Sequence, residues 1–206
     1  MNEIFKLRYR FRFLVIFFFI LTLKTTVFSQ YTLPQLPDVS SVEVCLPDTT
    51  GYSVITVGPV NRDYTNFQDA LNNAQLGSII VLDAGEIFIG NYTLPNITSG
   101  LTGGWIIITG SRSDLLPDEN TRIEPDSATG DGTFPNQQSA LPKIISDNNA
   151  AAITSAPAAH HYRFVGVEVS YTINANGIWN LIWIGDNYSN YSDIPHHFVF
   201  DRCYIH

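Results

Sequence analysis

Residues 64–90 restrict the possible folds more than any other part of the chain, because they join an amphipathic helix directly to a strand. The apolar residues of the helix recur at the spacing of one helix face, at Phe67, Ala70, Leu71 and Ala74. The following run, SIIVL at residues 78–82, is β-branched and lacks polar alternation. Such a run suits a strand that is buried on both sides or faces inward from a closed coil. We therefore expect a helix of about three turns to cover the open end of the stack that this strand begins.

Local signals predict where this helix begins and ends. Thr65 is placed to accept hydrogen bonds from the backbone N–H groups of the first turn. Gln68, three residues later, can reach back and complete a capping box. Gly77 adopts the left-handed conformation at little cost, which predicts that the helix ends just before it.

Short apolar runs recur along the rest of the chain. They occupy residues 105–109, 143–146, 152–154, 162–169, 181–184, 197–200 and 203–205. If Ile107, Ile145, Phe164, Trp183 and Phe200 are taken as equivalent positions, the gaps between them are 38, 19, 19 and 17 residues. The last three gaps predict a nearly constant coil length of 17–19 residues. Such a repeat is typical of a solenoid whose coils bury apolar residues only by stacking on one another.

Two other architectures fit the sequence less well. A β-sandwich needs hairpin signals between paired strands, and only Asn176-Gly177 and Asp131-Gly132 could supply them. A doubly wound α/β fold needs a helix between strands, and no second segment has helical periodicity. The sequence therefore predicts an all-β solenoid with one capping α-helix at its N-terminal end.

A helix and strand of the pattern FQDALNNAQLGSIIVLDAGEIFIG, followed by short apolar strands, resembles the N-terminal cap and first coil of right-handed parallel β-helix proteins. These proteins form the pectate-lyase-like superfamily, which shares the pectin-lyase fold. The resemblance covers residues 52–206 and implies the fold more specifically than the activity. Members include polysaccharide lyases, glycoside hydrolases, epimerases and non-catalytic adhesins.

The N-terminal segment has the features of a secretory signal peptide. Residues 1–29 contain a basic region, an apolar core at residues 13–23, and small or permissive residues before Gln30. The alternative is an uncleaved membrane anchor, but the apolar run is shorter than the roughly 20 residues needed to span a bilayer. We expect cleavage after Ser29, an extended leader at residues 30–51, and one domain at residues 52–206.

The charge of the mature chain limits its partners. Loss of residues 1–29 removes five of the 11 basic residues and one of the 19 acidic ones, which leaves a formal charge of −12. So acidic a protein is not expected to hold nucleic acid or an anionic membrane by general electrostatics. An acidic polysaccharide would need either a local basic cluster or bridging Ca²⁺, for which carboxylates are suitable ligands.

The long gap between Ile107 and Ile145 predicts an insertion at residues 111–141 that projects from one coil. It is rich in acidic residues, and Asp126 and Asp131 are the candidate metal ligands. In β-helix enzymes such loops wall the substrate groove, so the resemblance implies a groove wall or a Ca²⁺ loop. A solvated acidic loop is the alternative, because DSATGDG lacks the ligand periodicity of a calcium loop.

Two histidine pairs precede apolar runs at similar positions, His160-His161 and His196-His197. They are expected either to form a column that binds metal or acts in acid–base catalysis, with His197 as a catalytic candidate, or to cap the strands that follow.

Asp201 and Arg202 are the other catalytic candidates. The resemblance implies this pair, because β-helix lyases place Ca²⁺-binding Asp residues and an Arg base on one sheet face. Adjacent strand residues point to opposite faces. The two can therefore share a site only if one lies in a turn, and a corner ion pair is the alternative.

Aromatic residues are frequent in the C-terminal half of the chain, where their flat faces suit sugar rings. Tyr188 and Tyr191, in the loop DNYSNYSD, are the candidate substrate-binding residues, whereas Trp183 is expected in the core.

Cys45 and Cys203 are the only cysteines. Export would permit a disulfide between them, and a buried Cys203 thiol is the alternative.

Together these features predict an exported β-helix protein that binds a polysaccharide and cleaves it by lyase or hydrolase chemistry. The alternative is a non-catalytic β-helix with an adhesin-like or structural role. The chain ends at His206 within apparent strand structure. Because solenoids need a cap at each end, we expect this chain to be the N-terminal part of a longer protein.

Overall fold

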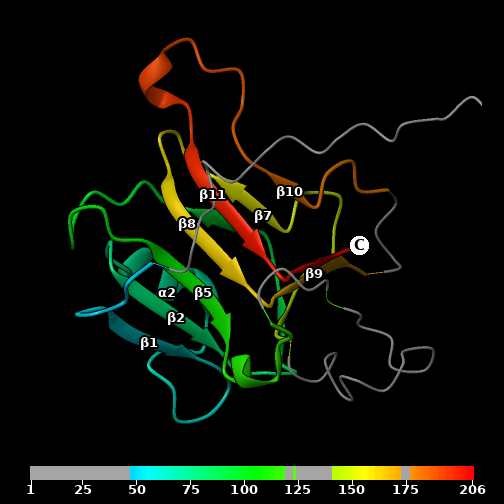
Figure 1. Cartoon of the computed structure of the whole chain (residues 1–206). Coiled ribbons are helices and arrows are strands. Elements are labelled where there is room, and N and C mark those ends of the chain that lie inside the picture. Colours follow the sequence, from blue (N-terminus) through cyan, green and yellow to red (C-terminus); the bar gives the residue numbers. More distant parts are fainter. Residues whose placement is uncertain (1–46, 119–122, 124–140, 173–176) are drawn as a thin grey trace, which may run out of the picture. The chain divides into compact units, whose positions relative to one another are not determined.

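The computed structural model describes residues 47–118, 123, 141–172 and 177–206 (Figure 1). The described residues all belong to one compact unit, which spans residues 45–206. The predicted signal peptide at residues 1–29 and most of the predicted leader lie outside the described residues.

The described strands form three sheets in which every pairing is parallel. The first sheet contains, in spatial order, β1 (Ser53–Val57), β2 (Ser78–Leu82), β5 (Ile106–Gly110), β8 (His160–Val165) and β11 (His196–Asp201). The second contains β3 (Ile87–Ile89), β6 (Lys143–Ser146), β9 (Glu168–Tyr171) and β12 (Tyr204–Ile205), and the third contains β4 (Tyr92–Leu94), β7 (Ile153–Ser155) and β10 (Ile182–Trp183).

From β2 onward the chain visits the first, second and third sheets in a repeating cycle, so each turn of the chain adds one strand to each sheet. Strands of successive turns lie side by side, as β2, β5, β8 and β11 do in Figure 1. The described structure is thus mainly β, with three all-parallel sheets and one short α-helix, as in a β-solenoid. This confirms the predicted solenoid architecture at that level.

The predicted coil length of 17–19 residues was wrong. In the first sheet Ile55 pairs with Ile80, Ile80 with Ile108, Ile108 with Phe164 and Phe164 with Phe200, which are steps of 25, 28, 56 and 36 residues. Each coil contains three short apolar strands. A gap of 17–19 residues therefore separates two sides of one coil rather than two successive coils.

Only Phe164 and Phe200 of the five supposedly equivalent residues are partners in the sheets. Ile145 belongs to the second sheet and Trp183 to the third. The run at residues 162–169 is also divided, because the chain turns a corner at Gly166, where φ is +62°, and β9 begins in another sheet.

Side chains of one face of every sheet stack inside the coils to form the core. Ile80, Ile108 and Phe164 are completely buried and lie in one column of the first sheet. The Phe164 ring stacks on that of Phe200 at 5.0 Å with an interplanar angle of 8°. A solenoid of this kind is stabilised by apolar burial between coils rather than within one.

Helix α2 (Phe67–Asn73) closes the end of this core. Its buried Phe67 ring lies 6.3 Å from the ring of Phe88 in β3 and 5.0 Å from that of Tyr92 in β4. Because β3 and β4 are the terminal strands of their sheets, the helix covers the open end of both, as predicted.

The ends of α2 differ from the prediction. The N-cap is Asn66 rather than Thr65, and its side-chain oxygen accepts hydrogen bonds from the backbone N–H groups of Gln68 and Asp69. The helix ends at Asn73, so it has about two turns. Gly77 has the expected left-handed φ of +88° but lies beyond the cap.

Gln68 does not form the predicted capping box. Its side chain accepts a hydrogen bond from the backbone N–H of Thr93 at 2.8 Å and donates one to the carbonyl of Thr93 at 2.9 Å. The amide therefore fastens the helix to the edge of β4, whose backbone groups would otherwise face water.

Cys203 carries a free thiol that packs against the core. Burial raises the pKa of this thiol to about 11, so it stays protonated. Cys45, its predicted alternative partner, lies outside the described residues.

Candidate functional site

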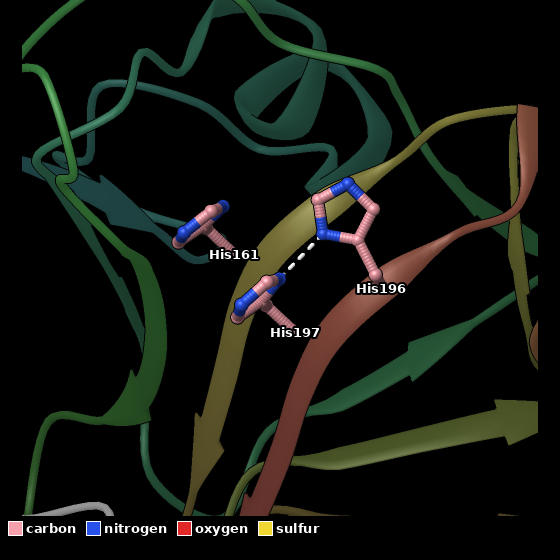
Figure 2. A group of neighbouring side chains, drawn as sticks. All are labelled: His161, His196 and His197. Carbon is pink, nitrogen blue, oxygen red and sulfur yellow. Dashed lines mark hydrogen bonds between the residues drawn. The ribbon is translucent and has the colours of Figure 1, made fainter. Parts of the chain in front are cut away.

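Two histidine pairs lie side by side at the beginnings of β8 and β11. His160 pairs with His196 in the parallel ladder, and the next ladder pair is Tyr162 with Phe198. His161 and His197 are therefore left out of the ladder as matching bulges, one on each strand. Figure 2 shows His161, His196 and His197 converging at this point.

The backbone at the two bulges explains why adjacent histidines share one side of the sheet. His161 has φ +58° and His197 has φ +59°, which is the left-handed region that residues other than glycine seldom adopt. This conformation turns the second histidine of each pair toward the first. The Nδ1 atoms of His160 and His161 are hydrogen-bonded at 2.7 Å, and those of His196 and His197 form the same contact.

The imidazole rings also stack between the coils. His161 lies on His197 with ring centroids 4.5 Å apart, and His160 lies on His196 at 5.3 Å, each with an interplanar angle of 5°. Trp105, directly before β5 in the preceding coil, presents its ring edge-on to His161 at 5.2 Å. We call these five residues the histidine–tryptophan cluster: Trp105, His160, His161, His196 and His197.

Burial and the neighbouring imidazoles lower the pKa values of His160 and His161, so this pair resists protonation. Burial is the main cause that lowers the pKa of His160 and of His161, and repulsion from the other histidines lowers it further. Neutral imidazoles can form an N–H···N hydrogen bond within a pair, because one ring donates and the other accepts. The same neutral nitrogens are the form of histidine that binds metal ions.

The ring nitrogens are close enough together to act on one ion. One nitrogen from each of His161, His196 and His197 lies within 4.8 Å of the others. His161 is half-buried, whereas His196 and His197 are exposed. The cluster is therefore open to solvent on the side of β11.

Asp201 and Arg202 form an ion pair at the corner after β11. Arg202 adopts φ +48° and donates from Nε to Asp201 Oδ1 at 3.0 Å and from Nη2 to Oδ2 at 3.1 Å. Arg163, from β8, donates to the same carboxylate at 3.0 Å. Burial alone would raise the pKa of Asp201, but the hydrogen bonds from Arg202 and Arg163 outweigh it, and the pKa lies below its usual value.

The start of the predicted insertion packs against this corner instead of only projecting from its coil. Arg202 Nη1 donates to the carbonyl of Pro117 at 2.8 Å. Leu116 packs on Gly166 in the corner before β9, and a Cβ at Gly166 would lie 2.5 Å from a Leu116 methyl group, which would have to move. Asp126 and Asp131, the candidate metal ligands of the insertion, lie outside the described residues.

The structure brings Asp201 and Arg202 together but not His197, the third catalytic candidate. His197 lies at the start of β11 and Asp201 at its end, which separates them by about 13 Å along the strand. Arg202 points toward Asp201 and Pro117 rather than toward the histidine–tryptophan cluster.

The aromatic candidates lie around β10 and the loop that follows it. Tyr191 is 90 % exposed in the short 3-10 helix η3 (Tyr191–Asp193), and Tyr188 is half-buried. Trp183 was expected in the core, but it is 51 % exposed. It pairs with Thr154, whose side chain faces outward, while its neighbour Ile182 pairs with the buried Ile153.

Sequence reasoning overlooked Trp105 as part of the site. The residue opens the apolar run at residues 105–109, which suggested only a core strand. Its position at the N-terminal end of an apolar run, where the histidine pairs also stand, was the signal that could have identified it.

Searches against protein-family models, curated proteins and solved structures found no match. The described helix is too short and too polar to span a membrane. The fold and the clusters described above define the class of this protein as a mainly β, parallel solenoid-like protein. Its function is inferred from its own residues.

Proposed function

We propose that this chain belongs to an exported right-handed parallel β-helix protein of the pectate-lyase-like type that binds a polysaccharide. The observation that carries the proposal is the outward-facing Trp183 on the third sheet, with exposed aromatic residues in the adjoining loops. Export is supported by the signal-like residues 1–29.

The outer face of the third sheet combines an apolar surface with hydroxyl groups. Trp183, Thr154 and Thr93 occupy matching positions on β10, β7 and β4. The hydroxyl oxygens of Thr93 and Thr154 lie 3.0 Å apart and are hydrogen-bonded. An indole ring beside hydroxyl groups suits a sugar, which presents an apolar ring face and a polar rim.

Further exposed aromatic residues extend this surface. Trp179, just before β10, is 95 % exposed, and Tyr191, after β10, is 90 % exposed. Exposed apolar side chains that form a contiguous patch mark a binding site, and we infer that these residues extend the surface around Trp183. The acidic net charge of −8 disfavours nucleic acid as that partner.

Binding of polysaccharides to the full chain tests the proposal. Neutral and uronate polysaccharides are titrated by calorimetry with and without Ca²⁺, because bridging Ca²⁺ is one way for an acidic chain to hold an acidic polymer. Trp183→Ala is expected to weaken binding about ten-fold, the loss of one aromatic contact. Tyr171→Ala is the matched control, since Tyr171 is an exposed aromatic residue at the end of β9 in the second sheet.

The proposal is wrong if the folded chain binds none of the polysaccharides, or if Trp183→Ala and Tyr191→Ala both leave binding unchanged. The products formed in the same incubations distinguish a lyase, a hydrolase and a non-catalytic binding protein. New unsaturated ends that need Ca²⁺ indicate a lyase, and new reducing ends without unsaturation indicate a hydrolase. Binding without turnover identifies a non-catalytic, adhesin-like β-helix.

A further inference from the structure

We propose that the histidine–tryptophan cluster is a binding site for one divalent transition-metal ion, with His161, His196 and His197 as its ligands. The proposal does not depend on polysaccharide binding, because the cluster lies on the first sheet and the aromatic surface on the third. Imidazole is a good ligand for Zn²⁺, Cu²⁺ and Ni²⁺ and a poor one for Ca²⁺ and Mg²⁺. The site would therefore select transition metals.

Binding of one ion requires the rings to rotate, because a metal ion lies in the plane of each imidazole that binds it and the stacked rings of His161 and His197 are parallel. The three candidate nitrogens lie within 4.8 Å of one another. Around a tetrahedral Zn²⁺ with bonds of about 2.0–2.1 Å, ligand nitrogens are about 3.3 Å apart. The exposed rings of His196 and His197 can close this difference by rotating about their side-chain bonds.

The backbone holds the ligands in place before any ion arrives. Parallel pairing fixes β8 against β11, and the two bulges direct His161 and His197 to the same side. Left-handed backbone at residues other than glycine costs about 1–3 kcal/mol and is concentrated at functional sites. Here the same costly conformation occurs at the same position on two neighbouring strands.

The contact between paired histidines must open to admit an ion, because their facing nitrogens lie closer together than two ligands of one Zn²⁺ do. In the His196–His197 pair the two facing Nδ1 atoms are hydrogen-bonded, so one ring donates and the other accepts. If an ion takes the lone pairs of both facing nitrogens, the proton of the donor ring moves to the other nitrogen of that ring. This change of tautomer leaves the number of protons on the two rings unchanged.

The remaining members of the cluster have supporting roles. His160 bonds to His161 and stacks on His196, so it holds two of the three ligands in position. Three protein ligands leave a fourth coordination position open toward solvent, as in zinc sites that bind a water or a substrate. The acidic net charge of the chain also raises the local concentration of cations.

Calorimetric titration of the untagged, full-length chain tests the proposal, with Zn²⁺, Ni²⁺ or Cu²⁺ as the ligand and Ca²⁺ and Mg²⁺ as comparison ions. We expect one transition-metal ion per chain. His197→Asn removes one ligand but retains a residue that tolerates left-handed backbone, and it is expected to weaken binding about 100-fold. His206→Ala is the control, because His206 lies outside the cluster and contacts Glu168 at 3.2 Å.

Fluorescence gives a second measurement that a general loss of folding would not reproduce. Cu²⁺ bound at the cluster should quench Trp105, whose ring lies 5.2 Å from that of His161. Trp105→Phe should abolish this part of the quenching while the stoichiometry of binding stays the same.

The proposal is overturned if the wild-type chain binds no transition metal. It is also overturned if His197→Asn and His161→Asn bind as tightly as the wild type, or if His206→Ala weakens binding to the same extent. Circular dichroism of each variant establishes that it is folded. Unchanged polysaccharide binding by His197→Asn at the same Ca²⁺ concentration would separate this result from the outcome for the proposed function.

Discussion

Phe164→Ala is expected to lower the free energy of unfolding by about 4 kcal/mol, the usual cost of truncating a fully buried Phe. Phe164 has no exposed surface and stacks on Phe200 with ring centroids 5.0 Å apart. Its other neighbour in the column is the buried Ile108. Truncation would therefore leave a cavity between three coils. Urea unfolding followed by circular dichroism measures the change.

A double-mutant cycle shows whether the coils have the register of the structure. Leucine replaces Phe164 here so that the variants stay folded. Phe164→Leu and Phe200→Ala are expected to be coupled by about 0.5–1.5 kcal/mol, as for stacked aromatic rings. Phe164→Leu and Trp183→Ala should be additive, because Trp183 lies in another sheet. Coupling between Phe164 and Trp183, without coupling between Phe164 and Phe200, would instead favour the 19-residue coil that the sequence suggested.

Asp201→Asn is expected to destabilise the protein by about 2–3 kcal/mol. The carboxylate of Asp201 accepts hydrogen bonds from Arg202 and from Arg163, whose side chain is only 4 % exposed. An amide of the same size removes the negative charge that both guanidinium groups face. Asp114→Asn is the control, because the Arg112–Asp114 pair is exposed to solvent, and exposed pairs contribute little.

The stabilisation by Asp201 should also depend on pH. The pKa of Asp201 is lower in the folded protein than its ordinary value of 3.8, so the unfolded chain takes up the proton first. The stabilising effect is therefore complete above about pH 5 and is lost as the pH falls through the lowered pKa. The difference between wild type and Asp201→Asn should shrink over that range. A difference that stays constant down to pH 2 would contradict this assignment.

Several elements could be predicted from the sequence because their signals are local. The runs SIIVL and KIIS match β2 and β6 residue for residue. The helix was recognised from its apolar spacing, and its capping role follows from the adjoining strand. The helix cap was misplaced by one residue because Thr65 and Asn66 are both good N-cap residues.

The coil length could not be obtained from the sequence. Strands on the three sides of a coil are equally short and apolar, so periodicity alone does not tell one sheet from another. Insertions of unequal length hide the repeat further, since the step from Ile108 to Phe164 is twice that from Ile80 to Ile108. The outward direction of Trp183 follows from its partner Thr154, which the sequence does not identify.

The candidate site was only partly visible in the sequence. The two histidine pairs stood out because each comes directly before an apolar run. The left-handed conformation of His161 and His197 gives no signal in the sequence, because it depends on the ladder that resumes at Tyr162 and Phe198. Without that conformation, the two histidines of a pair would point to opposite faces.

The central claim is that successive coils place the two histidine pairs against each other, 36 residues apart in the chain. Nuclear Overhauser contacts between imidazole ring protons in the folded full-length chain test it most directly. We predict contacts between His161 and His197 and between His160 and His196, whose rings lie 4.5 Å and 5.3 Å apart. Resolved imidazole signals without either contact would contradict the coil register, the histidine–tryptophan cluster and the metal site together.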